Sequence, residues 1–215
     1  MTRLFKLLAC SFVLAVVPVH AAQVTPTIAV DAASIVGSAF APGHEVVIFG
    51  AANVPQPYYA RLVDYLQVVT VDASGTFRWT PGEAISPRSI WFAVDLSSAE
   101  YCAAYPAAGN PPVSSLPAPS VHASRDAQND VLSTDEYTVK MLLVHANDAV
   151  WTGSPMRHGS SDLNQGNPGS MDIDLSQLRN VRGNKHFAGH LVPSDFVVLI
   201  DPVSLRFYAG RPSSH

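Results

Sequence analysis

The chain of 215 residues has only two cysteines, Cys10 and Cys102. Cys10 lies in an N-terminal segment that we expect to be removed, so a single thiol remains and an internal disulfide framework is excluded. Stability must then come from burial of apolar side chains, and about 190 residues suffice for one or two cores. We expect Cys102 to be a small buried residue of a strand rather than one half of an intermolecular bridge.

Basic residues and long apolar runs are also scarce. After the N-terminal segment, no stretch approaches the roughly 20 uninterrupted apolar residues that a membrane-spanning helix needs, so we expect no membrane insertion. Loss of Arg3 and Lys6 with that segment leaves 11 basic against 17 acidic residues, a formal charge of −6. This balance argues against nucleic acid and against anionic membrane surfaces as partners.

Residues 1–21 have the three parts of a signal peptide. Two basic residues are followed by an apolar stretch from Leu7 to Val17, and Val19-His20-Ala21 places small residues where a signal peptidase cleaves. We therefore predict export to the periplasm or the extracellular space. Leu7-Leu8-Ala9-Cys10 resembles a lipobox, the motif in which a cysteine is acylated after cleavage. Only three residues separate Lys6 from Cys10, fewer than the roughly 7 apolar residues that a signal core needs, so lipidation is not the preferred interpretation.

The rest of the chain is rich in short apolar runs bounded by turn residues. Each run has four or five residues, many of them β-branched or aromatic, which predicts strands buried on both faces. The runs are Val46–Phe49, Ile90–Val94, Met141–Val144 and Phe196–Ile200. Turns with proline or glycine are expected at residues 41–43, 72–75, 80–82 and 167–169. Within Tyr58 to Val71, helical spacing predicts a short turn or helix, followed by a strand from Leu66.

A weak internal repeat connects the two parts of the chain. Ser89 to Ala103 aligns with Asp195 to Ala209 at an offset of 106, with three identities in fifteen positions. The earlier runs align at an offset of about 95, which predicts an insertion of roughly a dozen residues at Val181 to His190. A true duplication and a chance likeness of two hairpins both remain open. We expect the inserted segment to be an exposed loop that can be shortened without loss of the fold.

Two segments of the first part are similar to bacterial immunoglobulin-like modules. Ser34 to Ile48 contains a Gly-Xaa-Ala, Pro-Gly and Val pattern, and Val71 to Trp79 contains an Asp-Xaa-Xaa-Gly-Xaa-aromatic hairpin. The hairpin predicts that Phe77 and Trp79 share an inward face. The resemblance implies an all-β immunoglobulin-like β-sandwich. It also implies a non-catalytic role in adhesion, spacing or ligand binding at the cell envelope.

One polar loop suggests a calcium site. Oxygen side chains recur in residues 160–167, and more acidic residues follow, which suits the convergent oxygen ligands of Ca²⁺. The candidate ligands are Asp162, Asn164, Asp172 and Asp174. Because the twelfth residue from Asp162 is Ile173 rather than glutamate, the loop is no EF-hand, and a polar hairpin loop is the preferred interpretation.

Other chemical sites have less support. His186 and His190 are spaced for zinc on a helix, but Phe187 replaces the glutamate of the zincin pattern, so surface histidines are the preferred interpretation. No nucleophile elbow or phosphate-binding glycine loop occurs. A platform for sugar rings is an alternative use of four aromatic side chains: Tyr58, Tyr59, Tyr65 and Trp151.

The sequence thus predicts two tandem β-sandwich modules, residues 22–105 and 121–215, joined by a proline-rich linker or loop at 106–120. We expect a non-catalytic exported binding or structural protein whose partner is a protein or a glycan. The alternative is a carbohydrate- or calcium-binding β-sandwich, and a metal-dependent hydrolase is third. We expect no cofactor, and calcium is the one alternative.

Overall fold

The computed structural model describes residues 25–55, 60–107, 122–125, 130–134, 140–145, 149–154 and 171–211. These residues form antiparallel strands and a single short 3-10 helix, η3 (Leu175–Gln177), which confirms the all-β prediction. The predicted signal peptide and nearly all of the proline-rich segment lie outside the described residues. Within the described ranges, no helix has the length and apolar character of a membrane span.

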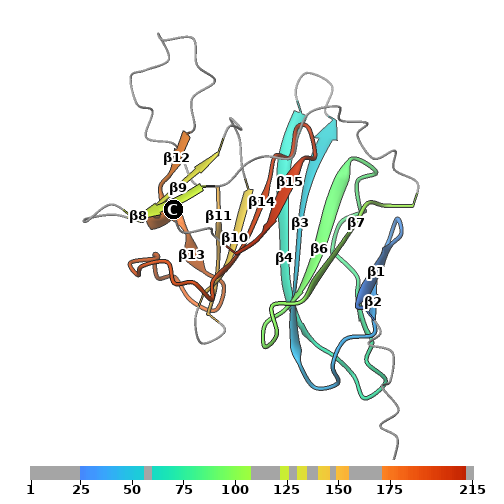
Figure 1. The fold of residues 1–215 in the computed structure, drawn as a ribbon. Coiled ribbons are helices and arrows are strands. Elements are labelled where there is room, and N and C mark those ends of the chain that lie inside the picture. Colours follow the sequence, from blue (N-terminus) through green and yellow to red (C-terminus); the bar gives the residue numbers. More distant parts are fainter. Residues whose placement is uncertain are drawn as a thin grey trace, which may run out of the picture.

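The first half of the structure, residues 25–107, consists of two antiparallel sheets (Figure 1). The smaller sheet has the order β1-β2-β5 and the larger one the order β4-β3-β6-β7. The strands are β1 (Thr27–Val30), β2 (Ile35–Ser38), β3 (Glu45–Pro55), β4 (Ala60–Thr70), β5 (Phe77–Trp79), β6 (Ser89–Asp95) and β7 (Tyr101–Ala104). The apolar runs predicted as strands at 46–49 and 90–94 are thus the centres of β3 and β6.

The second half, residues 122–211, repeats this strand order. Its smaller sheet is β12-β9-β8, and its larger sheet is β13-β11-β10-β14-β15, in which β13 is the one strand without a counterpart among the described strands of the first half. The strands are β8 (His122–Arg125), β9 (Asp130–Thr134), β10 (Lys140–His145), β11 (Ala149–Gly153), β12 (Met171–Ile173), β13 (Arg179–Asn180), β14 (Phe196–Ile200) and β15 (Phe207–Gly210). The runs at 141–144 and 196–200 are β10 and β14, as predicted.

The first half is a β-sandwich with its own core. Val30 and Phe77 of the smaller sheet pack with Ile48 and Trp91 of the larger sheet, and all four are buried. The Trp79 ring lies against this core at 5.9 Å from the ring of Trp91, between centroids. Phe77 and Trp79 therefore share the inward face, as the Asp-to-Gly hairpin predicted.

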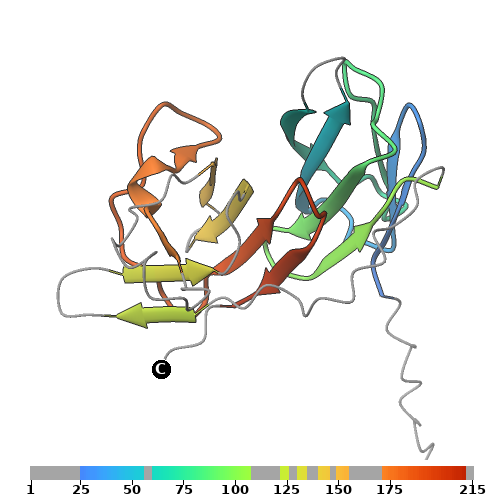
Figure 2. The ribbon, with the colours of Figure 1, turned by 90° about the horizontal axis from the view of Figure 1, so that it is seen from above.

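A larger cluster, here the shared core, lies between the two halves. Phe49 and Phe92 of the first half and Leu142 and Val198 of the second half belong to it, and each is fully buried. The two larger sheets thus pack face to face, and Figure 2 shows β14 and β15 (red) lying against β6 and β7 (green). This arrangement explains why the apolar runs of β3 and β6 are buried on both faces. One face of these strands packs in the first half's own core, and the other face packs against the second half.

The other face of the second half's large sheet has a third cluster. Met141, Leu143, Val197 and Leu199 point to this side and are covered by residues that follow β12. The covering residues are Leu175, Leu178 and Phe187, with exposed fractions of at most 7%. A segment with few apolar residues thus closes the sheet with three side chains.

The hairpins β6–β7 and β14–β15 have equivalent hydrogen bonds at their turns. Asp95 accepts the N–H groups of the residues two and three positions later at 2.8 and 3.1 Å, and Asp201 does the same at 2.9 and 3.2 Å. Each turn then holds a non-glycine residue at positive φ, Ala99 at 58° and Leu205 at 59°. The offset of 106 residues inferred from sequence is therefore the structural offset of these hairpins.

The offset of the earlier strands needs a small correction. Val47 pairs with Val94 on β6, and Lys140 pairs with Ile200 on β14. Because Val94 and Ile200 correspond at the offset of 106, Val47 corresponds to Lys140, an offset of 93 rather than about 95. A shift of two residues keeps the same side chains on the same face, which is why the apolar pattern did not reveal it.

Two sequence-based predictions were wrong in detail. Residues 60–70 form the single long strand β4, paired along its length with β3, so no helix precedes Leu66 in the described part. The inserted segment is largely exposed, but Phe187 is only 4% exposed and belongs to the third core cluster. Replacing residues 182–189 by a short Gly-Ser turn would remove this side chain, so we no longer expect the shortening to leave the fold intact.

Candidate functional site

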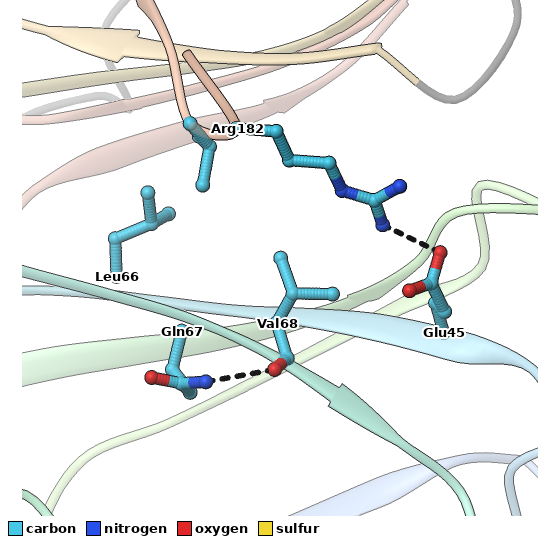
Figure 3. Close-up of a pocket in the computed structure, with 6 residues that line it drawn as sticks. Glu45, Leu66, Gln67, Val68 and Arg182 are labelled. Carbon is cyan, nitrogen blue, oxygen red and sulfur yellow. Dashed lines mark hydrogen bonds and ion pairs between the residues drawn. The ribbon is translucent and has the colours of Figure 1, made fainter.

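A hollow of about 420 Å³ lies at the edge of the contact between the two halves. The first half contributes Glu45 from β3 and the consecutive residues Leu66, Gln67 and Val68 from β4, and the second half contributes Val181 and Arg182, just after β13. Figure 3 shows Leu66 and Val68 pointing toward the Arg182 segment, while Gln67 points to the opposite side of the strand. Its size falls within the range of small-ligand pockets.

A charged pair bridges the hollow. Arg182 Nη2 donates to Glu45 Oε2 at 2.6 Å, and the two side chains are 57% and 45% exposed (Figure 3). Exposed pairs of this kind contribute only about 0–1 kcal/mol to stability. The pair therefore places a strong donor and a strong acceptor side by side above an aliphatic surface, and it is not needed to hold the halves together.

A second pair joins the halves, this time through Asp64 of β4. Lys140 Nζ lies 3.0 Å from Asp64 Oδ1 and 2.6 Å from Ser154 Oγ. Lys140 is the better shielded partner, with 13% of its side chain exposed against 39% for Asp64. This pair borders the shared core and has no part in the hollow.

The wall of the hollow that holds Arg182 is a small hairpin, residues 179–186, here the basic hairpin. Arg179 and His186 form an antiparallel bridge, and Asn180 N–H donates to the Lys185 carbonyl at 3.0 Å. The Asn180 side chain accepts from the Arg182 N–H at 2.8 Å and tightens the turn. Phe187 anchors its end in the third core cluster, so the hairpin is held at its base while Arg179, Arg182 and Lys185 are exposed.

Two histidine–aspartate pairs tie strand ends together. His145 Nδ1 lies 2.9 and 3.0 Å from the carboxylate oxygens of Asp195, which is fully buried. His44 Nδ1 lies 2.8 Å from Asp95 Oδ2. Because a carboxylate only accepts, each Nδ1 carries the proton. Among the described residues, neither histidine hydrogen-bonds to a serine, threonine or cysteine, so neither pair is part of a nucleophilic triad there.

The calcium candidates are not brought together by the described part of the structure. Asp162 and Asn164 lie outside the described residues, and for Asp172 only its place in β12 is described. Asp174 caps η3, where its carboxylate accepts from the Ser176 N–H at 3.0 Å and hydroxyl at 2.6 Å. No group of three or more acidic, histidine or cysteine side chains suited to a metal ion occurs in the described ranges.

One of the two zinc candidates, His186, serves local structure. His186 lies in an extended bridge with Arg179 rather than on a helix, and its Nδ1 lies 2.8 Å from the Ser176 carbonyl oxygen. The spacing of four residues between His186 and His190 therefore does not place them on one helical face.

The aromatic candidates for a sugar platform lie in different places. Tyr65 packs on Trp91 beside the first half's own core, with ring centroids 4.9 Å apart, whereas Trp151 packs on Phe187 in the second half. Tyr58 and Tyr59 lie outside the described residues. The two described members thus serve two separate clusters and form no common surface.

Burial raises the pKa of Cys102 to about 12. Cys102 lies in strand β7 as predicted, but it is half-buried rather than fully buried and packs against the first half's core.

Searches against protein-family models, curated proteins and solved structures found no match for this chain.

Proposed function

We propose that this chain is an exported, non-catalytic binding or structural protein built from two immunoglobulin-like modules. The observation that carries the proposal is the repeated strand order: β1-β2-β5 with β4-β3-β6-β7, and then β8-β9-β12 with β11-β10-β14-β15. Two sheets of short antiparallel strands, each about as long as those of immunoglobulin-like sandwiches, support that family of folds.

The segments that carry the sequence resemblance occupy fitting places. Residues 34–48 contain β2, the Pro-Gly turn and the start of β3, and residues 71–79 contain the Asp-to-Gly turn and β5. Gly43 and Gly75 adopt φ values of +80° and +78°, the conformation that glycine tolerates best. These turn residues support the immunoglobulin-like assignment because their chemistry is required by the hairpins themselves.

A non-catalytic role is supported by the structural hydrogen bonds that several acidic side chains make. Asp95 and Asp201 cap equivalent turns, Asp174 caps η3, and Asp195 orients His145. These hydrogen bonds give the four carboxylates structural roles in the described part of the chain. The exposed hollow, lined by aliphatic side chains and by the Glu45–Arg182 pair, supports binding instead.

Export and binding can be tested together. Cells expressing the complete chain should release a product whose N-terminus is Ala22, because cleavage is expected after Ala21. The released protein, used as bait in an envelope extract, should then retain a partner that it does not alter chemically. An uncleaved chain that stays in the cytoplasm contradicts the proposal, and so does a partner that is converted to a product.

The calcium-binding alternative has its own test. A ligand at a hundredfold excess over its dissociation constant raises stability by about 2.7 kcal/mol, so a bound Ca²⁺ should raise the melting temperature. Melting curves that coincide with and without a chelator would remove this alternative and leave the proposal as it stands.

A further inference from the structure

We propose that the hollow between the halves binds an acidic sugar residue of a glycan chain, with the basic hairpin holding the neighbouring acidic groups. This inference names a ligand class for the proposed binding protein and therefore rests on that proposed function.

The hollow offers the mixed surface that a sugar ring needs. Leu66, Val68 and Val181 are aliphatic and suit the C–H face of a ring, and the hollow is open to solvent. Glu45 and Arg182 stand together at one end and offer a carboxylate acceptor and guanidinium donors. A sugar hydroxyl can donate to the first, and a sugar carboxylate can accept from the second in a charge-assisted pair.

The charge of the basic hairpin favours an anionic ligand. No acidic residue occurs from Leu175 to Ser194, while Arg179, Arg182 and Lys185 fall within seven positions. All three are exposed, and the one ion pair made by these three side chains in the described structure is that of Arg182 with Glu45. The other two cations of the hairpin, Arg179 and Lys185, therefore have no ion-pair partner among the described residues. Such exposed charges act over about 8 Å at physiological salt.

The small extent of the basic region favours a glycan strand over other anionic partners. A flat anionic membrane would meet the acidic remainder of the chain, whose formal charge is −4 even with its predicted leader included. A peptide strand added to the edge of β4 would compete for the Val68 carbonyl, which already accepts from Gln67 Nε2 at 2.8 Å. A narrow polymer with spaced carboxylates touches only the hairpin and the hollow.

Binding should be measured with protein purified from cells that express the complete chain. The probe is an oligogalacturonate of defined length, with the neutral oligogalactoside of the same length as its control. We expect the acidic oligomer to bind at least tenfold more tightly than the neutral one. Binding should weaken as salt increases, because the cations are exposed.

Substitutions on the two sides of the bridge give opposite results if the ligand is acidic. Arg182→Gln should weaken binding of the oligogalacturonate about tenfold or more, because a hydrogen bond to a charged group is lost. Glu45→Gln should tighten binding, because the guanidinium no longer has a competing carboxylate. Arg88→Gln is the matched control: Arg88 is exposed and precedes β6, at the end of the sheet opposite Glu45, and should leave binding unchanged.

Several outcomes overturn the inference. They are equal binding of the neutral oligomer, equal binding of polyglutamate or of phosphatidylglycerol vesicles, and changes of the same sign for Arg182→Gln and Glu45→Gln. Loss of the pair should change the melting temperature little, so a fold defect is recognised separately. If the exported chain captures a partner whose binding ignores Arg182→Gln, this inference fails while the proposed function stands.

Discussion

Replacing Phe92 by alanine tests whether the two halves unfold as one unit. Phe92 is fully buried in the shared core, and its ring meets that of Phe207 from the other half edge-on, with centroids 4.9 Å apart. A buried Phe→Ala substitution costs about 3–5 kcal/mol, including the aromatic contact. With a urea dependence of about 2–3 kcal/mol per molar for a chain of this size, the unfolding midpoint should fall by about 1–2.5 M.

Hydrogen exchange in urea, followed by mass spectrometry of peptides, reports each half separately. Peptides of β6 and of β14 should lose protection at the same urea concentration, and Phe92→Ala should move both by the same amount. Phe92→Leu is the control, because a smaller change in buried volume should cost less than about 1.5 kcal/mol. If Phe92→Ala moves β6 and leaves β14 unchanged, the halves are independent modules and the shared core contributes little.

Three further results follow from local features of the first half. Gly75→Ala should lower stability by about 1–2 kcal/mol in a urea titration, because φ is +78° and the added Cβ would lie 2.8 Å from a backbone oxygen. Hydrogen bonds from Ser74 and Thr76 lower the pKa of Asp72, so this carboxylate stabilises the fold above its ordinary pKa and less as the pH falls. The stability difference between wild type and Asp72→Asn should thus be present at pH 7 and shrink between about pH 5 and pH 2; a difference independent of pH would show that the charge is irrelevant. At pH 8 the Cys102 thiol should react with a disulfide reagent about a thousandfold more slowly in the native chain than in urea, because its pKa is raised to about 12, and equal rates would contradict its burial.

The strands of the four apolar runs could be predicted because local pattern determines them. Val46–Phe49 and Phe196–Ile200 are short, rich in β-branched and aromatic residues and bounded by turn residues, which favours strands. The pattern also showed that both faces would be buried. It could not show what buries them, because the packing of one half on the other depends on residues about a hundred positions apart.

The errors have physical causes that the sequence does not display. In β4, Leu62, Val63, Tyr65 and Leu66 are all half-buried because the strand is covered in part on each face, and this gives a spacing that also fits a helix. Phe187 stands between histidine and small residues, a context typical of a loop, yet it fills a gap in the third core cluster. Propensity and pattern were overruled by tertiary contacts in both cases.

The candidate site was missed for a similar reason. Glu45, Leu66 and Arg182 are unremarkable in sequence and meet only after the halves have packed. One sequence property did point to the region: the absence of acidic residues from Leu175 to Ser194 in a chain with an acidic balance. Asp174, one of the predicted calcium ligands, caps η3 with its carboxylate, because a helix cap and a calcium ligand call for the same oxygen atoms.

The shared core also has a consequence for biosynthesis. Phe49 and Phe92 are made about a hundred residues before Leu142 and Val198, and at about 5–20 residues per second the second half follows the first by roughly 5–20 s. During that interval a whole sheet face of the nascent chain has no partner and is exposed to other chains. Holding the chain unfolded until translocation is complete would remove this hazard, because both sheets would then become available at the same moment.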